Sequence, residues 1–507
     1  MFVWSTPSPF EHGFCYRGRC ARRSHPAAIV RIESLVGRHC RECNSLDSAR
    51  LAPERARSLP NRHRSAILSD IATAPIGDTL TLLQGPRRVG KSVVMRELAA
   101  SLCGRNDVDA RQVISLACDG MTAQDVTRAI KLGRELTRSI DLSEPRRRVW
   151  LLDEVTPIKG WAMALKHARD TGAFGLDTVV ATGSSWRAEE DVEGHLFAGR
   201  AGTAGLRRLR QLMPLSFREF VISTRPLLPV PETLHPALLQ SPEARERLEA
   251  LRFAVDDFDL AWQAYLSSGG FPRAIHAMES NGFHDRGFLE DLHSWLRRDV
   301  DPDGPPESIM ALLEGLSRRS SSPLDRAGSS AALEYPSKVV FERRLGRLVA
   351  SYAAVWCPQR NSLGRSVPGT QPKLYLADPI LAWIPFLLRA GTVAPDFTRL
   401  AEQAIGVGLA RVIDDLEPGR WISGETIGYG RTSTGNEVDL TPVNVASSAG
   451  SRPTCPIESK WVDGGWRREA LTIEGKYAGG IVATKTVLDF EARAWAVPAP
   501  LLMMILA

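Results

Sequence analysis

The sequence predicts an α/β fold with a parallel main sheet, and three observations lead to this prediction. Short apolar segments typical of strands recur between residues 79 and 182, with helix-like stretches between them. Strands that alternate with helices pair in parallel, because a parallel neighbour is reached only through a long crossover. The first strand-like segment also leads into a glycine-rich turn and then a helix. With 507 residues, 43% of them hydrophobic, the chain is long enough for several cores.

The expected elements follow in order along the chain. Apolar runs predict strands over residues 79–84, 111–117, 149–153 and 177–182, with a helix over about 91–101. Further on, the spacing predicts helices over 242–300, a proline-rich break at 301–306, short helices over 307–360, and a helix followed by short strands over 396–490. We therefore expect five parts: 1–63, 64–235, 236–300, 301–375 and 376–507.

The positive charge is concentrated at the beginning of the chain. The formal net charge is +6, but residues 1–64 hold 12 Arg, no Lys and 5 acids, a net of +7. The remaining 443 residues hold 52 basic and 53 acidic side chains, a net of −1. Bulk charge therefore gives no support for nucleic-acid binding by the folded parts. No apolar stretch predicts a membrane span or a secretory signal, so no membrane partner is expected.

The first 63 residues predict an Arg-rich extension without regular structure. They contain Cys15, Cys20, Cys40 and Cys43, and the Cys40-x-x-Cys43 pair has the spacing of a zinc half-site. Two alternatives are a disordered arm and a translated upstream segment that is foreign to the natural protein. The other four cysteines are scattered in apolar contexts, which predicts small core residues and a reducing, cytoplasmic compartment.

The glycine-rich turn has the spacing of a phosphate-binding loop. It reads Gly85-Pro-Arg-Arg-Val-Gly90-Lys91-Ser92 and stands between a strand and a helix. Its glycines allow backbone N–H groups to surround a phosphate, Lys91 is placed to reach the β- and γ-phosphates, and the Ser92 hydroxyl is a Mg²⁺ ligand. We predict ATP and Mg²⁺ as cofactors. The predicted nucleotide-binding residues are Gly85, Pro86, Arg87, Arg88, Val89, Gly90, Lys91, Ser92 and Val93.

Polar residues at the ends of two later strands complete the predicted nucleotide site. Asp153 ends the run 149–153 and is expected to hold Mg²⁺, and Glu154 is expected to polarise the attacking water. At the end of 177–182, Thr182 or Ser184 is predicted to sense the γ-phosphate or to orient water; an ordinary helix cap is the alternative. Arg200 is a candidate arginine finger, with a solvated surface arginine as the alternative.

Several segments resemble those of prokaryotic AAA-type ATPases that carry an uncharacterised C-terminal domain. They are the loop 85–92, Leu151-Leu-Asp-Glu-Val155 with Trp161–Lys166, Ala181-Thr-Gly-Ser-Ser185, Pro214–Phe220 and Tyr265–Pro272. The resemblance covers about residues 66–490. It implies a P-loop ATPase domain over 64–235, a helical lid over 236–300, a winged-helix-like segment over 301–375 and a restriction-endonuclease-like α/β domain over 376–507. The later two motifs are expected to serve packing, and the loose composition of 320–330 departs from a DNA-reading helix.

Carboxylates in the last part form a second predicted site. Asp439 and Glu458 lie on short strand-like runs, and Lys460 follows Glu458 by two residues, so both project from the same strand face. The pattern is similar to the Asp…Glu-x-Lys site of restriction-endonuclease-like folds. The resemblance implies Glu402, Asp439 and Glu458 as metal ligands and Lys460 as a catalytic residue that activates water. An inactive module used for binding is the alternative, and Asp378 is expected to cap a helix.

Three functions remain as hypotheses. The first is a Mg²⁺-dependent ATPase coupled to the C-terminal module, in which Lys91, Glu154 and Arg200 are the catalytic residues. The second is an ATP-gated, metal-dependent DNA nuclease, and the third is a nucleotide-switched scaffold with little turnover. DNA and further copies of the chain are candidate partners, since an arginine finger that acts in trans requires an oligomer.

Overall fold

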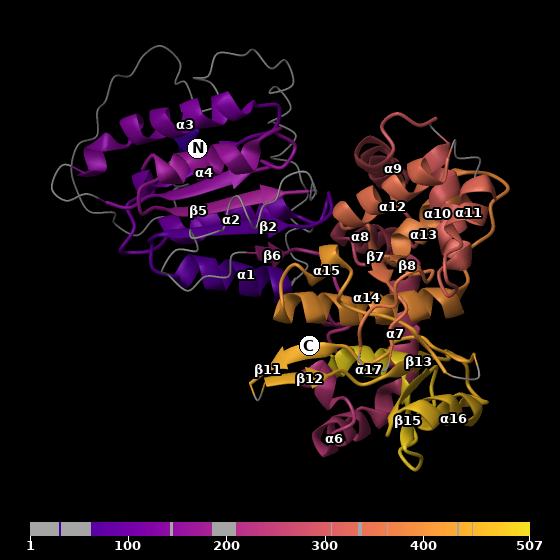
Figure 1. Cartoon of the computed structure of the whole chain (residues 1–507). Coiled ribbons are helices and arrows are strands. Elements are labelled where there is room, and N and C mark those ends of the chain that lie inside the picture. Colours follow the sequence, from indigo (N-terminus) through magenta and orange to yellow (C-terminus); the bar gives the residue numbers. More distant parts are fainter. Residues whose placement is uncertain are drawn as a thin grey trace. The chain divides into compact units, whose positions relative to one another are not determined.

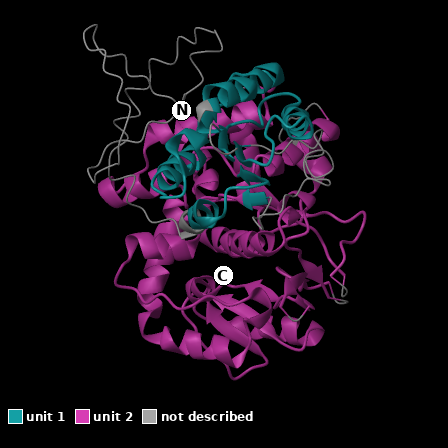
Figure 2. Ribbon diagram, turned by 90° about the vertical axis from the view of Figure 1, so that its left-hand side faces the viewer, with its two compact units in different colours: residues 1–50, 63–84, 90–210 teal, residues 51–62, 85–89, 211–507 magenta. Residues whose placement is uncertain are grey.

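In the computed structural model, the described residues are 30–31, 62–141, 146–184, 209–305, 307–332, 337–361, 364–432, 435–448 and 450–506 (Figure 1). The chain divides into two compact units, coloured separately in Figure 2. The first comprises residues 1–50, 63–84 and 90–210, and the second 51–62, 85–89 and 211–507. In the described part of the chain, no helix is long and apolar enough to cross a membrane.

The first unit is an α/β arrangement with a parallel sheet, as the sequence predicts. Its strands lie in the order β1-β3-β4-β5-β2-β6, and the β1–β3, β3–β4, β4–β5 and β5–β2 pairs are parallel. The strands are β1 (Val30–Arg31), β2 (Thr79–Gln84), β3 (Val113–Ala117), β4 (Val149–Asp153), β5 (Thr178–Gly183) and β6 (Leu209–Gln211). The helices are α1 (Arg62–Thr73), α2 (Lys91–Cys103), α3 (Ala123–Leu136) and α4 (Trp161–Asp170).

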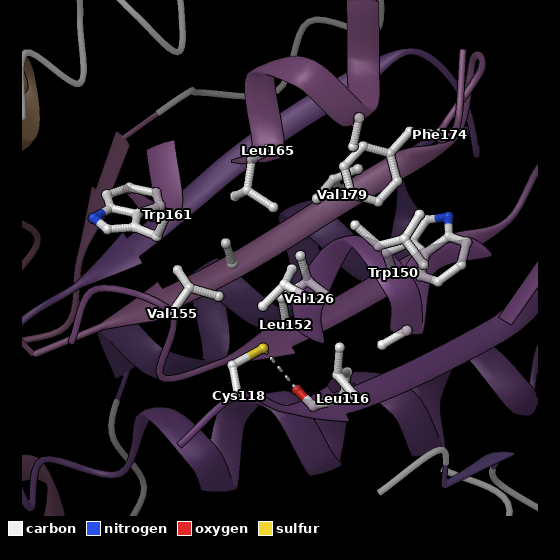
Figure 3. Close-up of a cluster of buried hydrophobic side chains, with 14 of the residues drawn as sticks. Leu116, Cys118, Val126, Trp150, Leu152, Val155, Trp161, Leu165, Phe174 and Val179 are labelled. Carbon is white, nitrogen blue, oxygen red and sulfur yellow. Dashed lines mark hydrogen bonds between the residues drawn. The ribbon is translucent and has the colours of Figure 1, made fainter. Parts of the chain in front are cut away.

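Burial explains why these short segments form strands. Every residue of β2 and β5 is buried, and a parallel sheet covered on both faces requires such continuous apolar runs. Helices α3 and α4 cover one face, and Figure 1 shows α2 on the other. The core between the sheet and α3 and α4 contains Trp150 and Phe174 in edge-to-face contact, with ring centroids 5.5 Å apart, and Leu165 and Trp161 continue the same core away from this pair (Figure 3).

The structure differs from the sequence prediction at one point of the first 63 residues. The sequence predicts no regular structure there, whereas Val30–Arg31 form β1 and pair in parallel with Ile114 and Ser115 of β3. The open edge of a sheet offers unpaired N–H and C=O groups to any extended segment, which accounts for so short a strand. The predicted zinc ligands Cys15, Cys20, Cys40 and Cys43 lie outside the described residues.

The first half of the second unit is helical. Its helices are α5 (Phe217–Thr224), α6 (Pro242–Ala250), α7 (Val255–Ser268), α8 (Pro272–Asn281), α9 (Arg286–Val300), α10 (Ser308–Arg319), α11 (Arg326–Ala332) and α12 (Lys338–Ala350). An antiparallel pair, β7 (Ala354–Cys357) with β8 (Lys373–Leu376), follows these helices. The predicted break at 301–306 separates α9 from α10. Helices α10–α12 followed by a two-stranded pair occupy the predicted winged-helix segment, whose identity stays a prediction.

The remaining elements of the second unit are short strands and helices. They are α13 (Pro379–Leu388), α14 (Phe397–Leu416), α15 (Arg420–Ser423), β9 (Gly430–Arg431), β10 (Glu437–Val438), β11 (Asn444–Ser447), β12 (Gly450–Pro453), β13 (Ile457–Ser459), α16 (Trp466–Lys476), β14 (Gly480–Thr484), β15 (Ala494–Pro498) and α17 (Ala499–Ile505). Strands β13, β14 and β15 form a parallel sheet, and α16 packs on it through Trp466, Ala470 and Ile473. Free Cys357 and Cys455 are buried here, and Cys118 is buried in the first unit, as predicted for core residues.

The two motifs without evident chemistry meet in the core of the second unit. Leu215 N donates to Gly270 O at 2.7 Å, and Gly270 N donates to the Asp378 carboxylate at 2.7 Å. A Cβ on Gly270 would lie 2.0 Å from Leu215 O, so only glycine allows this approach. Asp378 also accepts from Ile380 N at 3.0 Å and caps α13, which confirms the predicted helix cap. These motifs therefore serve packing.

Candidate functional site

The phosphate-binding loop connects β2 to α2. Three of its residues have positive φ: Gly85 at 149°, Arg88 at 69° and Gly90 at 104°. A Cβ on Gly85 would lie 1.9 Å from Leu212 O, which explains the glycine there. Gly90 precedes α2 without a side-chain cap, and Gly90 O accepts from Val93 N and Val94 N at 2.9 and 3.0 Å. The loop thus ends at the N-terminus of α2, where backbone N–H groups and the helix dipole favour the binding of a phosphate.

The first turn of α2 carries the predicted cation and hydroxyl. Lys91 is buried, and its Nζ lies 3.9 Å from Glu154 Oε1 at the end of β4. Ser92 is exposed on the same turn. In the second unit, Arg87 Nε donates to Asp299 Oδ2 at 2.9 Å, so the structure gives this predicted loop residue a carboxylate partner.

A hydroxyl network fixes the two carboxylates that follow β4. Thr182 Oγ1 donates to Asp153 Oδ1 at 2.5 Å and accepts from Glu154 N at 2.9 Å. Ser184 Oγ donates to Glu154 Oε2 at 3.2 Å. Glu154 itself has a φ of 54°, an uncommon value for a residue with a side chain. Strands β4 and β5 are neighbours, so Thr182 and Ser184 lie beside these carboxylates, and each hydroxyl orients a different one.

A P-loop fold implies a Mg²⁺ ion bound together with the nucleotide. The donor groups that the chain offers are the Ser92 hydroxyl and the Asp153 carboxylate, and Mg²⁺ prefers such hard oxygen ligands. The Thr182 hydroxyl holds one oxygen of Asp153 at 2.5 Å and so fixes the orientation of the carboxylate. These residues fit a Mg²⁺ site. The predicted arginine finger, Arg200, lies outside the described residues.

The C-terminal carboxylates do come together, but a lysine stands among them. Lys373 Nζ lies 2.9 Å from Glu402 Oε1, 2.6 Å from Glu437 Oε1 and 2.9 Å from Asp439 Oδ1. Lys373 begins β8, and its side chain is fully buried. Tyr375 on the same strand donates its hydroxyl to Glu402 Oε1 at 2.7 Å. This ammonium group takes up the space between Glu402 and Asp439.

The third predicted ligand lies beside the cluster. Glu458 Oε2 accepts from Asp439 N at 3.2 Å, and Ser459 N donates to Asp439 Oδ2 at 3.0 Å. Lys460 Nζ is 3.8 Å from both Glu458 Oε1 and Glu469 Oε1. Asp439, Glu458 and Lys460 line one cavity of about 590 Å³, which Arg399 and Arg468 also line. The Asp…Glu-x-Lys residues are thus brought together as predicted.

Burial and charge shift the pKa values of this cluster. Burial and the neighbouring Asp439 carboxylate together raise the pKa of Glu458 to about 9, which favours its protonated form at neutral pH. Burial and Asp439 also raise the pKa of Glu402. Burial by itself lowers the pKa of Lys373, but the carboxylates of Asp439, Glu402 and Glu437 outweigh burial and raise this pKa, which keeps the lysine charged.

The predicted restriction-endonuclease-like fold implies a divalent ion at Glu402, Asp439 and Glu458, and the described residues do not fit one. An ion that bridged Glu402 Oε1 and Asp439 Oδ1 would overlap the Lys373 ammonium, which contacts both oxygens. Nowhere among the described residues do three or more His, Cys, Asp or Glu side chains form a group that could hold a metal ion.

Sequence reasoning missed Lys373 and Tyr375. One signal was available: Lys373 is among only nine lysines, and it stands five residues before Asp378, the predicted helix cap. Its partners Glu402 and Asp439, however, are 29 and 66 residues away in the chain. No local spacing rule joins residues that far apart.

Comparisons with known proteins give one family match and several similar solved structures. Residues 78–221 match the model of a family described as an AAA domain. Among solved structures, the chain is similar to the Walker-type ATPase of Pyrococcus abyssi, with 14% identity over 65% of this chain and 96% of that chain and a TM-score of 0.35. It is also similar to the Aeropyrum pernix ORC1 protein in complex with DNA, with 14% identity, 70% and 94% coverage and a TM-score of 0.31. No curated protein matches the chain.

The loop geometry, the parallel sheet and the family match agree on the same stretch of sequence. Positive-φ residues shape the loop between β2 and α2, and the carboxylates of Asp153 and Glu154 follow β4, two strands away from β2 in the sheet. The matched residues 78–221 include all of these features. The chain therefore contains an AAA-type P-loop ATPase domain.

Proposed function

We propose that the protein is a Mg²⁺-dependent, cytoplasmic ATPase whose AAA-type domain acts together with the C-terminal module. Lys91 binds the β- and γ-phosphates, and Ser92 and Asp153 hold Mg²⁺, which neutralises phosphate charge when bound. Glu154 orients and polarises the water that attacks the γ-phosphate. Ser184 supports Glu154 through its hydroxyl, at 3.2 Å from Oε2.

The observation that carries this proposal is that two neighbouring carboxylates are each oriented by a different hydroxyl group. The Asp153 carboxylate is oriented by Thr182, and the Glu154 carboxylate by Ser184. Lys91 Nζ lies 3.9 Å from Glu154 Oε1, close enough to bring the phosphate-binding cation and the water-activating group to one place. A structural ion pair would not require a separate hydroxyl for each carboxylate.

Nucleotide binding by Lys91→Ala tests the proposal most directly. Loss of the ammonium should weaken ATP binding about 100-fold or more, since charge-assisted hydrogen bonds to phosphate are among the strongest a side chain makes. Titration with a fluorescent ATP analogue measures this. Lys131→Ala, which removes an exposed lysine from α3, is the matched control and should bind as the unaltered protein does. Intact binding by Lys91→Ala would refute the assignment of the loop.

The partner of the C-terminal module is a separate part of the proposal. We propose that ATP binding shifts the populations of module conformations, with DNA as a candidate ligand and Arg200, of the same chain or of a neighbouring copy, as a candidate finger. The nuclease alternative needs a metal ion in the carboxylate cluster, and the position of Lys373 weighs against it. ATPase assays with and without DNA, run beside cleavage assays in Mg²⁺ and Mn²⁺, separate the two. We expect DNA to stimulate ATP turnover without being cleaved.

A further inference from the structure

The carboxylate cluster of the C-terminal module already contains a cation. We propose that the ammonium group of Lys373 is the resident cation of Glu402, Glu437 and Asp439, and that it excludes divalent metal ions from this cluster. The module then has the carboxylates of a metal site and a lysine in place of the metal. This inference goes beyond the proposed ATP hydrolysis and does not depend on it.

The first argument is the hydrogen-bond inventory of the lysine. An ammonium group has three donors and no acceptor, and Lys373 Nζ has three carboxylate oxygens at 2.6 to 2.9 Å. The three carboxylates come from different elements: Glu402 from α14, Glu437 from β10 and Asp439 from the chain directly after β10. Two donors of the ammonium group therefore have hydrogen-bond acceptors, Glu402 and Asp439, and Glu437 forms a close ion pair with it, so the lysine joins three separate segments.

The second argument is the occupation of the carboxylate oxygens. Glu402 Oε1 accepts from both Lys373 and the Tyr375 hydroxyl, the latter at 2.7 Å. Asp439 Oδ1 accepts from Lys373, and its Oδ2 accepts from Ser459 N at 3.0 Å. A divalent ion needs several of these oxygens at about 2.0 to 2.6 Å. It would have to break existing hydrogen bonds and stand beside a positive charge.

The third argument is that Lys373 cannot easily leave. Its side chain is fully buried, and its backbone belongs to the β7–β8 ladder, where Lys373 pairs with Cys357. Its Nζ also lies 5.6 Å from the centre of the Tyr429 ring, which favours a cation there. Lys460, by contrast, is partly exposed at the cavity, 3.8 Å from Glu458. Lys460 is therefore accessible to a ligand in the cavity, whereas Lys373 is fixed among the carboxylates.

Counting bound Mn²⁺ ions tests this inference. Electron paramagnetic resonance measures free Mn²⁺ in titrations of the full chain without nucleotide. The unaltered protein and Asp439→Asn should bind the same number of ions. Lys373→Met, which keeps most of the length of the side chain but removes its charge, should bind one more ion than the unaltered protein, which should bind none at the cluster. The double variant Lys373→Met/Asp439→Asn should lose this ion, and Lys476→Met, a lysine that donates to Arg431 O outside the cluster, is the control.

Two results would overturn the inference. One is a Mn²⁺ ion bound by the unaltered protein and lost in Asp439→Asn, a comparison that stands even if Lys373→Met does not fold. The other is a folded Lys373→Met that gains no ion. Melting curves give an independent reading: Mn²⁺ should raise the melting temperature of Lys373→Met and leave that of the unaltered protein unchanged. None of these readings uses ATP turnover, so failure of the ATPase proposal and failure of this inference are distinguishable.

Discussion

Two buried lysines occupy opposite environments in the two units. Lys91 begins α2 directly after the glycine-rich loop, and Glu154 Oε1 lies 3.9 Å from its ammonium, beyond hydrogen-bond distance. Lys373 begins β8, and three carboxylate oxygens lie within 2.9 Å of its ammonium. Both side chains are nearly inaccessible to solvent. Burial therefore does not decide what a lysine does; the charge and distance of its neighbours do.

The difference also separates a site whose residues stand at the strand ends of a regular parallel sheet from a site whose residues come from irregularly ordered elements. The loop 85–92 and the ends of β4 and β5 all lie within the first 184 residues and follow the regular order of an α/β sheet. The cluster around Lys373 collects side chains from β8, from α14 and from β10 and the residue after it, and the lysine meets all three carboxylates only when these elements are in place. In the first unit, changes should therefore act on turnover, and in the second on stability and ion binding.

The largest expected effect is on turnover in Glu154→Gln. The amide keeps the shape of the side chain and can still accept from Ser184, but it cannot act as a base. We expect ATP turnover to fall by about 10²- to 10⁴-fold with ATP binding retained. A steady-state phosphate-release assay measures this. Glu135→Gln, on the exposed face of α3, is the control. Unchanged turnover in Glu154→Gln would remove this residue from the mechanism.

A smaller loss of turnover is expected from Thr182→Val. This nearly isosteric change removes the donor to Asp153 Oδ1 and the acceptor for Glu154 N, both in a buried position. Leaving such groups unsatisfied costs about 1 to 3 kcal/mol, so we expect a fall of about tenfold in turnover together with a lower unfolding temperature. Ser184→Ala, which removes one hydroxyl contact, should have the weaker effect. A larger loss of turnover in Ser184→Ala than in Thr182→Val would contradict this network of hydroxyl contacts.

Part of this organisation is readable from the sequence, because some of its residues stand in local motifs and others do not. Residues 79–84 and 149–153 are continuous apolar runs, so their predicted bounds equal those of β2 and β4. The loop residues and Asp153 and Glu154 follow from the ends of those strands. Lys373 does not, because its role exists only through partners that folding brings from 29 and 66 residues away. An ion pair between residues far apart in the chain produces no periodic or local pattern in the sequence from which it could be predicted.

The pH dependence of stability gives a smaller effect in the second unit. Burial raises the pKa of Asp378 from its ordinary value to about 7. Between about pH 4 and 7, Asp378 keeps its proton in the folded state, whereas in the unfolded chain it has released that proton. The contribution of Asp378 to the free energy of unfolding therefore falls as the pH rises, by at most about 1.4 kcal/mol per pH unit. Asp378→Asn cannot ionise, and its unfolding free energy should lack this slope.

Urea unfolding at pH 5, 6, 7 and 8 measures the slope as the difference between Asp378→Asn and the unaltered protein. Asp396→Asn is the matched control, because Asp396 caps α14 in the same way through Thr398 N and Arg399 N but is exposed. Its difference from the unaltered protein should not depend on pH in this range. A pH-independent difference for Asp378→Asn as well would show that Asp378 is ionised in the folded state.

Deletion of residues 1–63 should have the smallest effect of all. The deletion removes 11 Arg and 5 acids, a net charge of +6, together with β1, whose contact with the sheet is the short pairing of Val30–Arg31 with β3. The phosphate-binding loop stands between β2 and α2, and β2 is separated from β3 by β4 and β5 in the sheet. We therefore expect ATP affinity within about twofold of the full chain, since surface changes away from a site rarely exceed about 0.5 kcal/mol. Titration with the same fluorescent ATP analogue measures it. A large loss of ATP affinity would mean that the extension contributes to the nucleotide site. That site would then not consist of the loop and the strand ends alone.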